Sequence, residues 1–168
     1  MRAVPIALLA AALTACATVT RYDAAGDIHA LLVAIRDNDG QAFDAHVDRP
    51  ALEAQMKARL TAAAVQRGGA LGGFLAQAFG GLTDALVDAA VQPQVFLAVA
   101  EAKGYQPSKP LPSRVAISQS LRYLEGDRVC VTGNRDGPCL LVFRNESGTW
   151  RLIAFEGPLD ALKLPKAG

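Results

Sequence analysis

Asp44, His46 and Asp48 are the residues whose types and spacing come closest to a catalytic site in this chain. A carboxylate that orients a histidine is the usual way to build a general base, so the three side chains could serve a hydrolase or an isomerase. Positions i and i+2 of a helix do not face each other, however, and Asp48 stands where an N-cap would precede Pro50. We therefore predict no catalytic residue and keep a hydrolase or isomerase that uses Asp44, His46 and Asp48 as the alternative.

Residue types that bind metal ions are sparse and badly spaced. The two histidines, His29 and His46, have no H-E-x-x-H pattern or cysteine cluster beside them, so no zinc site is predicted. Residues 37–40, Asp-Asn-Asp-Gly, invite comparison with a calcium loop, but that loop would need an oxygen ligand at Ile35 and a glutamate at position 46. Their expected role is to end a helix. Phosphate-binding loops and nucleophile elbows are also missing, and we predict no cofactor.

The first of three cysteines lies at the end of an export signal. An apolar run begins at Ala3 and reaches Leu13, too short to span a bilayer as a mature helix. The residues Leu13-Thr14-Ala15-Cys16 resemble the lipobox of bacterial lipoproteins, in which the peptide is cut before the cysteine and that cysteine carries lipid. The alternative is an ordinary secretory signal cut after Ala17, because Ala15-x-Ala17 also fits the cleavage rule.

This lipobox resemblance implies a division of the chain into a signal peptide over residues 1–15, a lipidated tether over 16–26 and one domain over 27–168. Several acyl chains on Cys16 would anchor the protein to a membrane stably without spanning it. Ala17 stands where an aspartate would mark retention in the inner membrane. By the same resemblance we expect the outer membrane, with the domain facing the periplasm.

With Cys16 assigned to lipid, Cys130 and Cys139 remain as an even pair in an oxidising compartment. They lie in apolar segments on either side of the turn-rich residues 133–138, which is typical of a hairpin. If Cys130 faces Cys139, Val129 stands opposite Leu140 and one face of the hairpin is apolar. We predict a disulfide; a hairpin in another register would leave two buried thiols instead.

Length and composition suit a single globular domain. The chain has 168 residues, of which 51% are hydrophobic, and 17 Lys and Arg residues stand against 16 Asp and Glu residues. Without Arg2 of the leader these charges cancel, so no basic excess is available for nucleic acid. We predict no nucleic-acid partner. A membrane surface, a small apolar ligand or a protein of the envelope are the expected partners.

Helical spacing dominates the first part of the chain. Helices are expected from Asp27 to about Arg36, over Gln41–His46, from Pro50 to about Gln66, over Leu82–Val91 and from Pro93 to Gly104. The helix from Pro50 has an apolar stripe made by Leu52, Met56, Leu60 and Ala64, and the helix from Pro93 has a predicted buried side made by Val95, Phe96, Val99 and Ala100. Between Gly68 and Gly81 six glycines are interleaved with apolar residues, and a broken helix or loop is expected there. Three roles are open for this glycine-rich segment: internal helix packing, a lid or lipid-touching loop, and an oligomer interface.

Alternating polar and apolar residues follow the proline-rich residues 107–112. Four strands are predicted, over Val115–Tyr123, Arg128–Thr132, Cys139–Asn145 and Thr149–Phe155. Helices followed by a four-stranded antiparallel meander make an α+β domain. Trp150 alternates with Leu152 in the last strand, so we expect it in the sheet core rather than at a pocket.

Several short segments carry a family resemblance: Val47–Pro50, Leu86–Asp88, Val91–Pro93, Leu141–Arg144 and Gly148–Leu152. Over roughly Ala24 to Pro158 the chain resembles the bacterial family labelled domain of unknown function 2939, membrane-anchored or exported proteins without an assigned activity. This resemblance implies no catalytic residue. Helices on a curved antiparallel sheet are also similar to the cystatin-like or nuclear-transport-factor-like cone, which hosts both binding proteins and enzymes.

Overall fold

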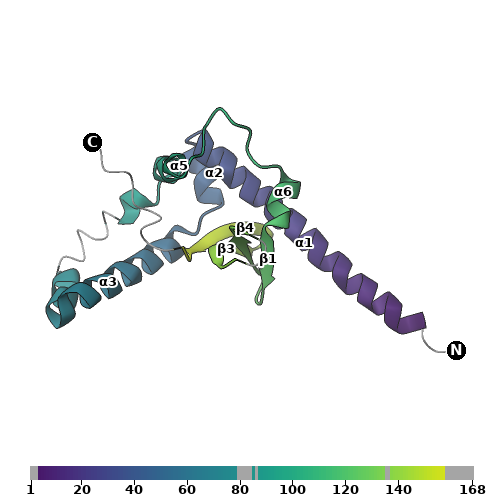
Figure 1. Ribbon diagram of the computed structural model, residues 1–168, viewed down its shortest axis with the longest axis horizontal. Coiled ribbons are helices and arrows are strands. Elements are labelled where there is room, and N and C mark those ends of the chain that lie inside the picture. The colour runs from purple at the N-terminus through teal and green to yellow at the C-terminus, as the bar shows by residue number, and fades with distance from the viewer. Residues whose placement is uncertain (1–3, 79–84, 86, 135–136, 158–168) are drawn as a thin grey trace.

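The computed structural model describes residues 4–78, 85, 87–134 and 137–157, and for residues 4–19, 67 and 70–78 it describes the backbone alone. Helices come first and strands last (Figure 1). The elements are α1 (Val4–Arg36), α2 (Gly40–Ala45), α3 (Arg49–Ala78), α5 (Pro93–Ala102), α6 (Arg114–Gln119), β1 (Leu121–Leu124), β2 (Arg128–Thr132), β3 (Cys139–Glu146) and β4 (Thr149–Phe155). The predicted α+β class is confirmed.

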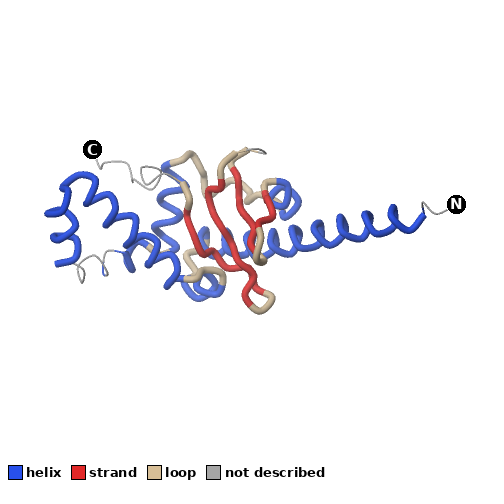
Figure 2. The backbone as a smooth tube through the Cα atoms, turned by 90° about the horizontal axis from the view of Figure 1, so that it is seen from below, coloured by secondary structure: helices blue, strands red, loops and turns tan. Residues whose placement is uncertain are grey.

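The four strands form an antiparallel meander in the order β1-β2-β3-β4, as predicted. Figure 2 shows α1 passing behind the strands, and in Figure 1 α2, α5 and α6 lie on the same side of the sheet as α1. The hydrophobic core fills the space between these two layers, where Phe143 and Leu152 of the sheet and Phe43 of α2 are fully buried. Trp150, at 2% exposure, belongs to this core and not to a pocket, as expected.

Helix α1 begins well before Asp27, where the helix start was predicted. No proline lies between Ile6 and Gly26, and Ala24 and Ala25 are fully buried. At Gly26 the guanidinium of Arg114 lies alongside the helix, 3.7 Å from where a Cβ would stand. Tertiary packing therefore stabilises the helix through a segment that was expected to be a tether. Residues 20–26 belong to the folded part of the chain.

Residues 37–40 end α1 as predicted. Asn38 adopts a left-handed conformation with φ of 54°, and the Asp39 carboxylate accepts a hydrogen bond from the N–H of Ala42 (3.0 Å) to cap α2. Asp37 pairs with Arg36, whose Nε lies 2.7 Å from its carboxylate. The acidic residues of this segment thus serve the helix ends.

Helix α3 is broken within the glycine-rich segment, in agreement with the prediction. Gly69 has φ 58° and ψ −144°, a backbone conformation that glycine adopts without the steric penalty of a Cβ. Residues 79–84 and 86 lie outside the described residues, and residues 87–90 are helical. The apolar stripe predicted for α3 includes Leu60, which is instead 43% exposed, because α3 continues past the end of the sheet (Figure 1).

The first predicted strand is wrong over most of its length. Residues Arg114–Gln119 form α6, and β1 contains only Leu121–Leu124. The Ser113 hydroxyl accepts a hydrogen bond from the N–H of Ala116 (3.3 Å) and so caps α6. In a helix Ile117 is buried while Val115 stays 56% exposed. A short apolar alternation does not by itself distinguish a strand from one helical turn, and here the cap and the packing of α6 on α1 decide it.

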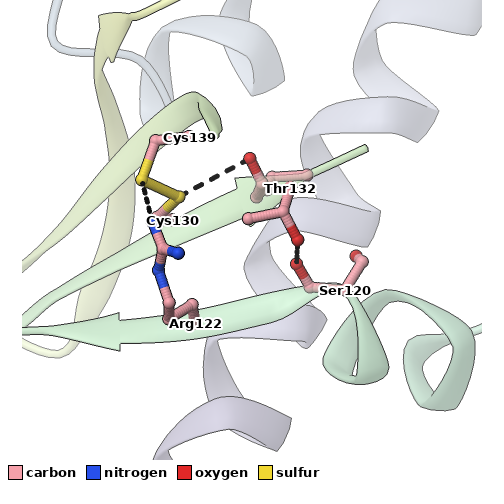
Figure 3. Close-up of a disulfide and its surroundings, with 6 residues drawn as sticks. Ser120, Arg122, Cys130, Thr132 and Cys139 are labelled. Carbon is pink, nitrogen blue, oxygen red and sulfur yellow. Dashed lines mark hydrogen bonds between the residues drawn. A yellow bond between two sulfur atoms is a disulfide. The ribbon is translucent and has the colours of Figure 1, made fainter. Parts of the chain in front are cut away.

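The predicted disulfide between Cys130 and Cys139 is present, with the two Cα atoms 5.5 Å apart, but the predicted register is wrong. Cys130 pairs with Val142, and Cys139 pairs with Thr132 next to a β-bulge. The bond therefore crosses the hairpin diagonally (Figure 3). The observed register sets Val129 opposite Phe143, both fully buried, and so places large apolar side chains of both strands on the helix side of the sheet.

Candidate functional site

An apolar cleft of about 410 Å³ lies between α3, α5 and the sheet. One wall is a face of α3 made by Leu52, Gln55, Met56 and Arg59, which follow the i, i+3, i+4, i+7 spacing of one helix side. This volume falls within the range typical of small-molecule sites, which are mostly apolar with a few polar groups. The cleft is therefore the candidate functional site.

Helix α5 supplies the opposite wall. Its residues Val95, Phe96, Val99, Ala100 and Lys103 line the cleft, with Ala90 and Val91 just before the helix. The side chains of α5 that were predicted to be buried are only half-buried, because they line this cleft, although Phe96 also packs against the core. Pro93 in the first turn starts the helix, since its fixed φ suits that position and its missing N–H is not needed there.

Side chains of β3 and β4 form the floor. Leu140 and Leu141 come from β3, and Leu152 and Phe155 come from β4, where Leu141 pairs with Phe155. A β-bulge between Val142 and Phe143 shifts the register at this point. The paired ends of β3 and β4 thus form the apolar floor of the cleft, between the walls that α3 and α5 supply.

Arg49 holds the α5 wall in place. Its Nη1 donates to the carbonyl of Val91 and lies 3.8 Å from the Asp88 carboxylate, just before α5 begins. Its guanidinium also lies 5.6 Å from the ring centroid of Phe43, and that ring meets the Phe96 ring edge-on at 5.3 Å. Arg49 therefore connects the start of α3 to the start of α5.

Arg59 and Gln55 close the corner between α3 and β4. The Arg59 guanidinium donates to the carbonyls of Phe155 (2.7 Å) and Gly157 (2.8 Å) and lies 5.9 Å from the Phe155 ring centroid. Gln55 accepts a hydrogen bond from the Phe155 N–H (2.9 Å) and donates one to the Glu156 carboxylate (3.2 Å). The polar atoms of both α3 residues are used to hold this wall against the sheet.

The structure does not bring Asp44, His46 and Asp48 together as a catalytic group. Asp44 accepts a hydrogen bond from Arg49 Nε (2.6 Å), while Asp48 caps the first turn of α3 and pairs with Arg144 (3.1 Å). His46 Nδ1 is buried and has no partner among the described residues. The predicted N-cap role of Asp48 is confirmed, and each carboxylate serves a different arginine.

Asp48 belongs to a network of charges at the turn between β3 and β4. Arg144 donates from Nε to Glu146 (3.0 Å), and Arg151 donates from Nη1 to the other oxygen of that carboxylate (3.3 Å). The hydrogen bond from Arg144 lowers the pKa of Glu146 and in turn raises the pKa of Arg144. Arg151 also donates to the carbonyl of Val47 (2.7 Å), so the network ties the segment before α3 to the sheet.

The other residues singled out in the sequence have structural contacts. His29 Nδ1 donates to the carbonyl of Pro112 (3.0 Å) and so joins α1 to the proline-rich connector. Cys139 Sγ of the disulfide lies 3.2 Å from a guanidinium nitrogen of Arg122 on β1 (Figure 3). Over the part of the chain that the structure describes, no three His, Cys, Asp or Glu residues are grouped so as to hold a metal ion. No helix among those residues has the length and apolar character needed to cross a membrane.

Sequence reasoning missed the cleft and its two cations, Arg59 and Lys103. The apolar stripes on α3 and α5 were visible in the sequence, but a stripe that lines a cleft has the same periodicity as one that is buried. A basic residue in register with each stripe is the signal that was available: Arg59 lies seven residues after Leu52 and three after Met56, and Lys103 lies four residues after Val99.

Comparisons with known proteins identify a family and little more. No curated protein and no solved structure matches this chain significantly, so the similarity to the cone fold stays a prediction. The model of one family, described as "Protein of unknown function (DUF2939)", matches residues 9–99. The match extends further toward the N-terminus than the resemblance from Ala24 and stops within α5, before the sheet. The chain belongs to this family of proteins of unknown function.

Proposed function

We propose that this chain is a membrane-anchored lipoprotein that faces the periplasm, and that its domain binds a small apolar ligand in the cleft between α3, α5 and the sheet. The observation that carries the binding proposal is the cleft itself, about 410 Å³ in volume and lined mainly by Leu, Val, Phe, Met and Ala. Apolar surface left open to water on both helices costs free energy that a bound apolar ligand would recover.

The membrane anchor is supported by two features of the chain. Leu13-Thr14-Ala15-Cys16 has the lipobox pattern, and the Cys130–Cys139 disulfide is of the kind that persists in oxidising compartments. Ala24, the first buried residue among those whose side chains the structure describes, lies eight positions after Cys16, a helical stretch of about 12 Å. A lipid on Cys16 would therefore keep the domain near the membrane surface, where apolar ligands are plentiful.

Binding is tested with the neutral fluorescent probe N-phenyl-1-naphthylamine. The protein is the full-length chain with its own leader and the change Cys16→Ser, which removes acyl chains that would compete for the cleft and keeps Ala15-x-Ala17 for export cleavage. Val99→Trp fills the cleft, and Val115→Trp adds the same side chain at an exposed position of α6. We expect the probe to bind the parent protein and Val115→Trp with equal affinity, and Val99→Trp at least about tenfold more weakly.

Thermal unfolding of each variant shows whether it is folded, and Ala100→Leu provides a smaller intrusion into the same cleft. Equal probe binding by the parent, Val99→Trp and Ala100→Leu would contradict the proposal. Probe binding that appears only after residues 158–168 are deleted would also contradict it, because the cleft would then be the site of the chain's own C-terminal segment. Native mass spectrometry of the purified chain would identify a ligand that copurifies.

The enzymatic alternative through Asp44, His46 and Asp48 receives no support from the geometry, since the two carboxylates are paired with Arg49 and Arg144. A His46→Ala variant that fails to complement a deletion strain while keeping its thermal stability would revive it.

A further inference from the structure

The ionisable side chains that line the cleft are both basic. Among the described residues that line it, the ionisable side chains are Arg59 on the α3 wall and Lys103 on the α5 wall, and neither wall contributes an acidic residue. Glu156, near the end of β4, is not part of the lining and accepts a hydrogen bond from Gln55. A ligand that entered between the two helices would therefore meet one basic side chain on each wall together with the apolar side chains of the lining.

Lys103 is the cation available to a ligand. Arg59 already donates two hydrogen bonds to the carbonyls of Phe155 and Gly157, whereas the Lys103 ammonium makes no hydrogen bond or ion pair with any residue that the structure describes. Lys103 both lines the cleft and is exposed to water, so it stands at the opening. A lysine in such a place can lay its aliphatic stem along apolar surface and keep its charge in water.

We propose that the ligand of this cleft is a single-chain anionic amphiphile of the fatty-acid type, with its hydrocarbon chain against Phe96 and Leu152 and its carboxylate at the opening near Lys103. This inference rests on the proposed binding function and names the class of ligand. A volume of about 410 Å³ is at the low end for ligand sites and favours one acyl chain over a two-chain lipid. A cationic headgroup would meet Lys103 with the same charge, which is unfavourable.

The test is displacement of N-phenyl-1-naphthylamine from the full-length Cys16→Ser protein by three amphiphiles that share one chain: dodecanoate, dodecanol and dodecyltrimethylammonium. Each is used below its micelle concentration, against the parent, Lys103→Gln, Lys103→Glu and the matched control Lys109→Gln. Lys109 lies in the proline-rich connector and is exposed outside the cleft. Thermal unfolding confirms that the variants are folded.

We expect dodecanoate to displace the probe best from the parent and dodecyltrimethylammonium worst. Lys103→Gln should weaken dodecanoate binding by about two- to fivefold, the size expected for an exposed charge pair, and Lys103→Glu by about tenfold. Dodecanol binding should not change, and added salt should weaken only dodecanoate binding. Lys109→Gln should behave as the parent.

The outcomes separate the two proposals. If none of the amphiphiles displaces the probe, or the probe does not bind at all, the binding function itself fails. If dodecanol and dodecanoate compete equally well and Lys103→Glu leaves both unchanged, the cleft binds apolar ligands but the assignment of an anionic headgroup is overturned. Preference for dodecyltrimethylammonium would overturn it as well.

Discussion

Loss of the Cys130–Cys139 disulfide should destabilise the domain by an amount that follows from its place in the hairpin. The bond joins residues nine apart in sequence, and closing so short a loop removes unfolded-state entropy equivalent to about 2.5–3 kcal/mol. For a chain of this size about 1 kcal/mol shifts the melting temperature by about 2–4 °C, so we expect the oxidised protein to melt about 6–10 °C higher than the protein without the bond.

The perturbation is made in two ways, because Cys130 is fully buried and its replacement removes packed atoms as well as the bond. Reduction of the parent chain breaks the bond and keeps both sulfur atoms. The double change Cys130→Ala and Cys139→Ala breaks the bond and removes them. Thermal unfolding is followed by circular dichroism, with and without reductant, and the mass of the alkylated protein counts free thiols.

Reduction of the parent should lower the melting temperature by most of this amount, and the double variant should melt at a slightly lower temperature still. Reductant should not change the melting temperature of the double variant. A melting temperature that falls by less than about 2 °C on complete reduction would refute the loop-entropy reasoning. Two free thiols in the protein isolated from an oxidising compartment would refute the bond itself.

Two further predictions concern the anchor and the charge network. Labelled palmitate fed to cells should be incorporated into the parent chain and not into Cys16→Ser, whereas equal labelling of both would contradict lipidation at Cys16. The hydrogen bond from Arg144 lowers the pKa of Glu146, so this interaction stabilises the fold fully above the unfolded-state pKa of about 4.3 and is lost as the pH falls through the folded-state pKa. Glu146→Gln should therefore lower the free energy of unfolding by about 0.5–1 kcal/mol near neutral pH, and this loss should shrink below about pH 4. The control is Glu125→Gln, whose carboxylate has no ion pair with the described residues and which should change the free energy of unfolding little at either pH. Urea unfolding at both pH values measures the two variants.

The sequence predicted an element correctly wherever a single residue type, such as a capping aspartate, a proline or a glycine, determines where a helix begins, ends or breaks. Asp48 caps its helix as predicted, residues 37–40 end α1, Pro93 starts its helix, and the glycine-rich segment breaks α3 at Gly69. The prediction was wrong where two structures share one local pattern. The alternation around Ile117 fits both a short strand and one face of a helix turn, and the contact of α6 with α1 decided between them.

For the disulfide, the sequence predicted the two bonded cysteines but not the register of the strands that carry them. Cysteine count and the turn between the two apolar segments predicted the partners, because a hairpin brings its ends together whatever its register. The register depended on which side chains face the helices, and pairing Val129 with Phe143 places both in the core. That choice involves α1 and α2, which lie about a hundred residues away along the chain.

By itself the sequence determined the α+β class, most helix ends, the disulfide partners and the membership of a family without an assigned activity, because caps, turns and periodicity act over a few residues. Only the tertiary structure decided that the stripes of α3 and α5, which meet the core through Leu52 and Phe96, also face each other across a cleft. Arg49 and Arg59 hold those walls by contacts with Val91 and Phe155, distant in sequence. Periodicity shows that a helix has an apolar side, but only the arrangement of its neighbours determines whether that side is filled by protein or left for a ligand.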